Sequence, residues 1–160
     1  MFITINNDYN NAFTEDVLLR ENDYIVGLFA EICRIIDDLK LAKFSVLFKD
    51  WDKRFNSPDF VYDFSDVAPE LPELVSFLQS KSGEYSLAFH ELDREIKFKF
   101  NDEILFFTIN EEDNVLYHGE LDAIKFKTII ETLINDFSFL LAKFFPKSYE
   151  VFKKEKYIIS

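Results

Sequence analysis

The residues that decide the fold run from Tyr85 to His118 and read YSLAFHELDREIKFKFNDEILFFTINEEDNVLYH. Polar and apolar residues alternate strictly from Glu95 to Phe100, which is the period of a β-strand with one buried face. Two short polar turns follow, and strands joined by short turns leave no room for crossover helices. The stretch therefore predicts an antiparallel sheet with strands at residues 85–89, 95–100, 104–109 and 115–118.

The third of these segments, Ile104 to Ile109, is apolar on both faces of the expected strand. Strands that are buried on both sides have this composition. We therefore expect residues 104–109 to form a central strand that is covered on both sides, or nearly so.

Three helices are expected around this sheet. Apolar residues recur at spacings of three and four from Tyr24 to Leu39 and again along residues 124–145, which follow a capping Asp122 and end at Pro146. A third helix is predicted from about Pro69 to Lys81, with Asp66 or Ser65 as its cap, because prolines suit a first turn. Gly83 lies just past its end, where a left-handed residue is often needed.

Smaller elements complete the prediction of one α+β domain over residues 1–160. Its antiparallel sheet has about four to five strands and is packed by an N-terminal helix and a long C-terminal helix. We expect short strands at residues 1–5 and 44–48, an irregular stretch at residues 50–66 and a tail helix at residues 149–156.

Composition indicates a folded interior built largely from phenylalanine. The chain has 160 residues, of which 20 are Phe and one is Trp, and aromatic residues dominate cores by area. Cys33 stands alone between apolar neighbours, which predicts a buried, inert thiol without a disulfide. Neither the N-terminus nor residues 124–145 read as a signal peptide or a membrane span, so we expect a cytosolic protein.

Charge is concentrated in one internal region. The chain carries a net charge of −12, and residues 50–120 hold 17 carboxylates against six Lys or Arg. A field of this kind attracts cations or a basic partner and repels nucleic acid and anionic membranes. The sequence therefore predicts a basic protein partner, with no nucleic acid and no membrane.

Motifs for catalysis are missing from the sequence. Three glycines rule out glycine-rich phosphate loops, and no nucleophile elbow occurs. His90 and His118 stand near carboxylates at the ends of two expected strands, which leaves a small metal-dependent hydrolase open as an alternative. We expect no catalytic residue, no metal and no cofactor.

The segment from Asp50 to Glu73 interleaves acids with aromatic residues. An interface for a basic partner needs both, because carboxylates steer the encounter while buried aromatics supply binding energy. The alternative is that Trp51 and Tyr62 belong to the core and the acids are ordinary solvated residues. The candidate partner-binding residues are Asp50, Trp51, Asp52, Asp59, Tyr62, Asp63, Asp66, Glu70 and Glu73.

In size, acidity and α+β pattern, the whole chain resembles the immunity proteins of bacterial toxin–immunity systems, including contact-dependent growth inhibition. The resemblance implies tight binding and neutralisation of one cognate toxin, often a basic nuclease. We also expect the free protein to be a monomer rather than an obligate oligomer. Two further alternatives stay open beside the hydrolase. One is an acidic nucleic-acid mimic that inhibits a host or phage enzyme, and the other is a structural subunit of a larger assembly.

Overall fold

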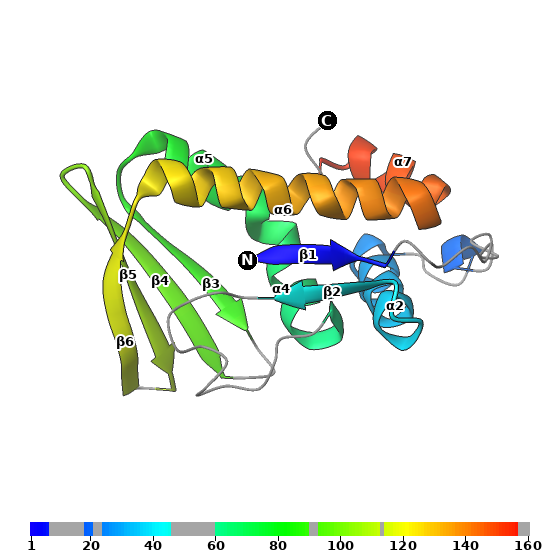
Figure 1. The fold of residues 1–160 in the computed structure, drawn as a ribbon, viewed down its shortest axis with the longest axis horizontal. Helices are drawn as coiled ribbons and strands as arrows, with labels where there is room; N and C mark the ends of the chain where they lie inside the picture. Colours follow the sequence, from blue (N-terminus) through cyan, green and yellow to red (C-terminus); the bar gives the residue numbers. More distant parts are fainter. Residues whose placement is uncertain (7–17, 21–23, 46–59, 90–92, 113, 157–160) are drawn as a thin grey trace.

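A four-stranded antiparallel sheet stands at one end of the molecule, and the helices lie on one side of it (Figure 1). This computed structural model describes residues 1–6, 18–20, 24–45, 60–89, 93–112 and 114–156. The sheet contains β3 (Glu84–Phe89), β4 (Arg94–Asn101), β5 (Ile104–Glu111) and β6 (Asn114–Leu121), each paired with the next. The α+β class and the meander of four strands are therefore confirmed.

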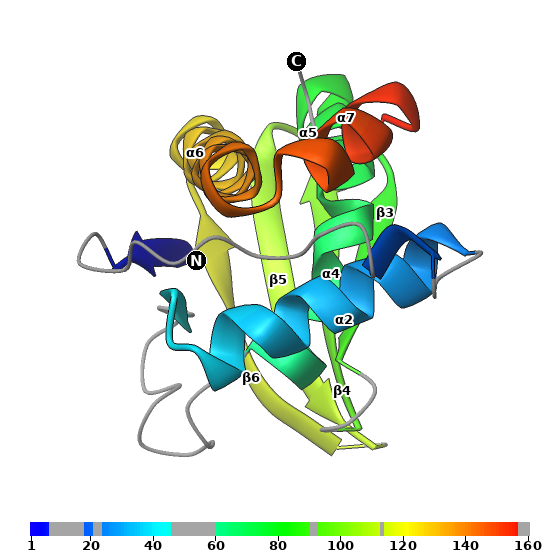
Figure 2. The same ribbon diagram turned by 90° about the vertical axis from the view of Figure 1, so that its right-hand side faces the viewer.

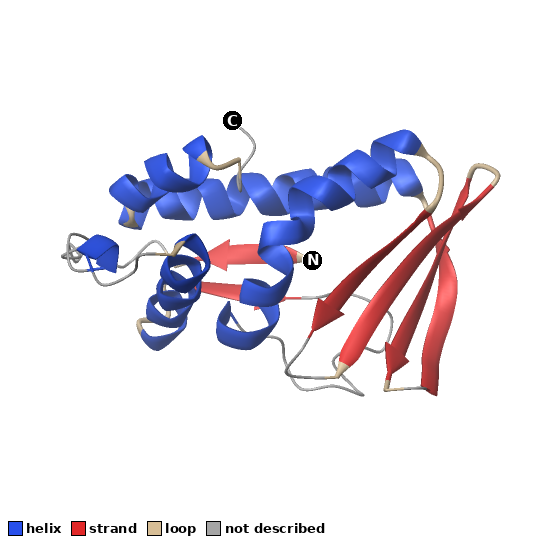
Figure 3. Ribbon diagram, turned by 180° about the vertical axis from the view of Figure 1, so that it is seen from behind, coloured by secondary structure: helices blue, strands red, loops and turns tan. Residues whose placement is uncertain are grey.

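The alternation along β4 sets the two faces of the sheet. Ile96, Phe98 and Phe100 are buried, whereas Lys97 and Lys99 are exposed. The expectation that residues 104–109 are covered on both sides is wrong, although β5 is an inner strand. Ile104 is 47 % exposed on the outward face, because the described helices and the second sheet lie on the opposite, inward face (Figure 3).

Gly119 allows aromatic rings to pack on the inward face at β6. It pairs with Phe107 of β5, and an added Cβ would lie 2.9 Å from the Phe107 ring and 3.2 Å from the Tyr117 ring. Phe107 is almost fully buried. A side chain at residue 119 would therefore displace a core ring.

A separate two-stranded sheet replaces the fifth strand that the sequence suggested. β1 (Phe2–Ile5) pairs antiparallel with β2 (Ala42–Ser45), so that Ile3 lies opposite Phe44. β1 packs beneath α6 (Ala123–Phe144), the longest helix (Figure 1). Both Ile3 and Phe44 are buried, so this small sheet contributes to the core.

The C-terminal helices follow the predicted boundaries closely. The Asp122 carboxylate accepts hydrogen bonds from the backbone N–H groups of Ile124 and Lys125, at 3.1 and 3.0 Å, which confirms it as the cap of α6. Pro146 separates α6 from α7 (Pro146–Lys154), since a proline cannot continue the preceding helix. The tail helix thus starts three residues earlier than expected.

The segment before Pro69 is helical, which corrects two expectations. A continuous helical run covers residues 60–80 through η1 (Phe60–Phe64, a π-helix), α4 (Ser65–Val67), η2 (Ala68–Glu70, 3₁₀) and α5 (Leu71–Ser80). Asp66 therefore lies inside the run rather than at its start, and the Ser65 hydroxyl donates back to the Val61 carbonyl. The prolines stand where one helix type changes to the next, because each removes a backbone donor.

Left-handed backbone follows the run, as expected, but begins before the glycine. Lys81, directly after α5, has φ 52°, and Gly83 has φ 86°. The two positive φ angles turn the chain from α5 into β3.

Phenylalanine builds the core, as predicted. Every described Phe is buried except Phe2, Phe106 and Phe139. The ring of Phe64 lies at the centre of one cluster, with ring centroids of Phe44 and Phe60 at 5.0 Å and of Phe137 at 4.8 Å. Cys33 of α2 (Ile25–Asp38) is fully buried, as expected for an inert thiol.

Candidate functional site

The helical run divides its side chains between an inward and an outward stripe. Core residues recur at helical spacing on the inward side: Phe60, Phe64, Val67, Leu71, Leu74 and Leu78. Four of the predicted partner-binding residues recur at spacings of four, four and three on the other side. We call these the outward stripe: Tyr62, Asp66, Glu70 and Glu73.

Asp63 falls on the inward stripe instead. It is only 5 % exposed and lies between Phe60 and Phe64 in η1. A carboxylate that steers a partner must face water, so Asp63 does not suit the role that the sequence suggested for it. The other candidates, Asp50, Trp51, Asp52 and Asp59, lie outside the described residues.

The C-terminal half of the outward stripe is fixed to the sheet through Tyr85. The Tyr85 hydroxyl donates a hydrogen bond to the Glu70 carbonyl oxygen at 3.1 Å, and it lies 3.4 Å from Glu70 Oε2. Burial raises the pKa of Tyr85, and the charges of Glu70 and Glu73 raise it further. The Tyr85 ring also stacks on Phe77 at 5.6 Å. The stripe is therefore anchored to β3.

The helix α2 and the start of the helical run pack against each other (Figure 2). An apolar groove lies between them. Its volume is about 150 Å³. Among the residues that line the groove, Phe29 is buried, whereas Val26 on the α2 wall is 69 % exposed. Asp66 of the outward stripe lines the opposite wall. The full lining comprises Ile25, Val26, Phe29, Ala30, Ser65, Asp66 and Pro69.

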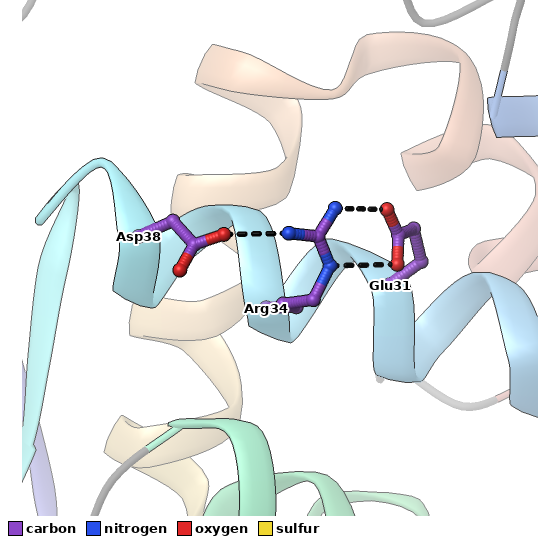
Figure 4. Close-up of polar contacts among 3 residues, drawn as sticks. All are labelled: Glu31, Arg34 and Asp38. Carbon is purple, nitrogen blue, oxygen red and sulfur yellow. Dashed lines mark hydrogen bonds and ion pairs between the residues drawn. The ribbon is translucent and has the colours of Figure 1, made fainter.

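An ion-pair clamp lies one helical turn beyond the α2 wall of this groove. Arg34 donates to Glu31 at 2.9 and 2.5 Å and to Asp38 at 2.6 Å (Figure 4). The hydrogen bond from Arg34 lowers the pKa of Glu31, and the same contact raises the pKa of Arg34. Two carboxylates therefore balance the single basic residue of α2.

Both walls of the groove belong to negatively charged helices. α2 has three carboxylates and one Arg, a net charge of −2, and residues 60–80 have four carboxylates with no Lys or Arg. Carboxylates on helical surfaces at this density produce a local negative potential. An apolar groove is thus set in an acidic surface.

The outward face of the sheet holds a second hollow, and the charges around it are arranged differently from those around the groove. It has a volume of about 380 Å³ and is lined partly by Phe106 and Thr108. Here Lys99 pairs with Glu84 at 2.5 Å and Lys97 pairs with Glu95 at 3.0 Å. The bond from Lys99 lowers the pKa of Glu84. Acids and bases on this face therefore largely neutralise each other.

Metal binding has no support in the part of the chain that the structure describes. Within those residues, no three His, Cys, Asp or Glu side chains gather closely enough to hold an ion. His118 is exposed on the outward face of β6, opposite Thr108, and His90 lies outside the described residues.

No protein-family model, curated protein or solved structure matches this chain. Over the described residues, none of the helices combines the length and the apolar character that crossing a bilayer requires.

The sequence named the four residues of the outward stripe as candidates, but it predicted neither their common stripe nor the groove. The sequence holds a partial signal, since Val26 and Ala30 are uncharged residues four apart on the outer side of an amphipathic helix. Nothing in the sequence indicated that this side of α2 lies next to Asp66. The packing of two elements about 40 residues apart creates the site.

Proposed function

We propose that this protein binds a basic toxin domain in the cytosol and neutralises it, as an immunity protein does. The observation that carries the proposal is the apolar groove between α2 and the helical run, whose walls have a net negative charge. The described part of the chain offers no cluster of metal-ligating residues that would favour a hydrolase instead.

The two components of this surface have separate tasks in binding. The carboxylates of the outward stripe and of α2 would accelerate encounter with a basic protein and set its orientation. Apolar burial in the groove and at the exposed Tyr62 would slow dissociation, because aromatic and aliphatic anchors supply most of the energy at protein interfaces. Together they fit a high-affinity inhibitor with a basic target.

A nucleic-acid mimic is less well supported by the geometry. Three carboxylates, Asp66, Glu70 and Glu73, follow one helix face over about 10 Å, whereas proteins that bind duplex DNA commonly contact about 6–10 phosphates. On the sheet, acids that could extend the row are paired with lysines. The described acids therefore do not form a long phosphate-like track.

The test is co-expression with the C-terminal domain of the protein encoded by the adjacent open reading frame. We expect that domain to stop growth alone, and growth to recover when this chain is present. The purified pair should bind with nanomolar or tighter affinity, and its association rate should fall as salt rises. No growth rescue, or an association rate that is independent of salt, would contradict the proposal.

A further inference from the structure

We infer that the groove between α2 and α4 accepts one large apolar side chain from a partner segment that carries a Lys or Arg next to that side chain. The basic residue would contact Asp66 on the groove wall. The inference rests on the proposed function, because it assumes a basic protein partner, and it adds where and how that partner is held.

The size of the groove limits what can enter it. Apolar cavities of about 150 Å³ in proteins accept a benzene-sized molecule, and this groove has the same volume. It is therefore too small for a helix or a strand but suits one Phe, Trp, Leu or Met side chain. Phe29 and Pro69 offer apolar surface for that side chain to cover.

The negative charge of the groove walls favours a basic residue next to the apolar side chain that enters the groove. The helical run from residue 60 to residue 80 has no Lys or Arg. On α2 the only cation, Arg34, is balanced by Glu31 and Asp38. An acidic partner would be repelled from both walls, whereas a Lys or Arg near the anchor would be attracted.

A hollow between α5 and α6 lacks this combination of an apolar lining with a carboxylate. That hollow has a volume of about 250 Å³, and its charged lining residues are Lys81 and Lys127. Lys127 pairs with Glu131 at 2.7 Å. Its lining has no carboxylate, so it lacks the attraction for a basic partner that Asp66 provides in the groove.

The probe for this inference is a random 12-residue peptide library displayed on phage and selected on the full chain. We expect enriched peptides to combine a large apolar residue with a Lys or Arg within one helical turn or strand repeat. Enriched sequences without a basic residue, or with no common large apolar residue, would overturn the inference.

Two variants then separate the shape of the groove from its charge. Ala30→Trp fills the groove without changing charge, and it should weaken the best peptide about tenfold or more. Asp66→Asn keeps the shape and should weaken that peptide about threefold, with a smaller dependence on salt. Ala142→Trp, at an exposed position on α6, is the matched control and should bind as the wild type does. Circular dichroism verifies that each variant is folded.

The outcomes separate this inference from the proposed function. If Ala30→Trp binds peptide as tightly as the wild type, the groove is not the site and the inference fails. If the adjacent toxin domain also binds Ala30→Trp normally and is still neutralised, the proposed function stands without the inference. If peptides require the groove but the toxin domain does not bind, the groove still accepts an apolar side chain beside a basic residue, and the toxin as its partner is contradicted.

Discussion

Two outward faces of the molecule come from the same acidic stretch and differ in how their charges are balanced. On the sheet, the register places Glu84 opposite Lys99, and the two side chains form an ion pair. On the helical run, residues 60–80 contain no Lys or Arg at all. A net charge of −11 over residues 50–120 therefore does not locate a binding surface. The distribution of cations within that stretch does.

The sheet face behaves as an ordinary solvated surface. Its two ion pairs are exposed, with the Lys99 and Glu84 side chains 64 % and 69 % accessible, and exposed pairs contribute little to stability. Alternation along β4 places acids and lysines on the same face. The helical run instead places one acid, Asp66, in the wall of an apolar groove, which is the arrangement expected at an interface.

The largest expected effect is on partner affinity when the charge of the outward stripe is reversed. The double variant Asp66→Lys, Glu73→Lys should weaken binding of the proposed toxin partner by about 100-fold or more, because two attractive contacts become repulsive. Surface plasmon resonance should show the loss mainly as slower association at low salt.

The matched control makes the same change in net charge on the sheet. Glu84→Lys with Glu120→Lys, both on the outward face, should alter affinity by less than about threefold. Equal losses in the two double variants would show that the overall charge, rather than the outward stripe, attracts the partner. Melting temperatures of both variants verify that they remain folded.

An intermediate effect is expected for an ion pair of the sheet that contributes to the stability of the fold. Arg94 is only 10 % exposed and donates to Glu111 across β4 and β5 at 3.0 and 2.8 Å. Arg94→Ala should lower the free energy of unfolding by about 1–3 kcal/mol, because it leaves a partly buried carboxylate without this contact. Urea unfolding measures the change, and Lys99→Ala, at an exposed pair, should cost well under about 1 kcal/mol.

Measuring partner binding by the Arg94→Ala variant tests whether Arg94 contributes to stability alone or also to the interface. Arg94→Ala should bind the proposed toxin partner as the wild type does at temperatures where it is folded. A clear loss of affinity in Arg94→Ala would mean that the sheet contributes to the interface and that the two faces are less different than we propose.

The smallest effect concerns acid stability at the Arg34 clamp. The hydrogen bond from Arg34 lowers the pKa of Glu31 in the folded state below its ordinary value of 4.5. The clamp therefore stabilises the fold above about pH 4.5, and this contribution disappears as pH falls through the lowered pKa. Glu31→Gln should cost about 0.3–0.5 kcal/mol at pH 7. Urea unfolding at pH 7 and pH 3 should show this difference only at the higher pH.

The sheet could be predicted from the sequence because its signals are local. Strict alternation from Glu95 to Phe100 indicates a strand and shows which of its side chains face the core. The polar turns indicate which strands pair with each other. The start of the helical run could not be predicted, because Pro69 and Pro72 resemble a helix start. Acidic residues also stand among Phe60, Tyr62 and Phe64, and they obscure the helical spacing of the apolar residues in the sequence. That spacing becomes clear only once the structure places Phe64 in the aromatic core.

The candidate site could be predicted only in part for a related reason. Helical spacing from Tyr62 to Glu73 brings four of the predicted residues onto one stripe, and the same spacing places Asp63 inside. The groove depends on the packing of Val26 and Ala30 beside Asp66, and no local pattern in the sequence indicates which helix faces meet.

The π-helical turn η1 has a consequence for how the chain tolerates insertions and deletions. Each residue advances a helix by about 100°, and a π turn holds one residue more than an α turn. A deletion within residues 60–64 could be absorbed by converting this turn to α-helix, so that Asp66, Glu70 and Glu73 would keep their orientation. A deletion after residue 66 would instead rotate the later acids toward the core. Chain length is therefore less constrained in η1 than in the helix that follows it.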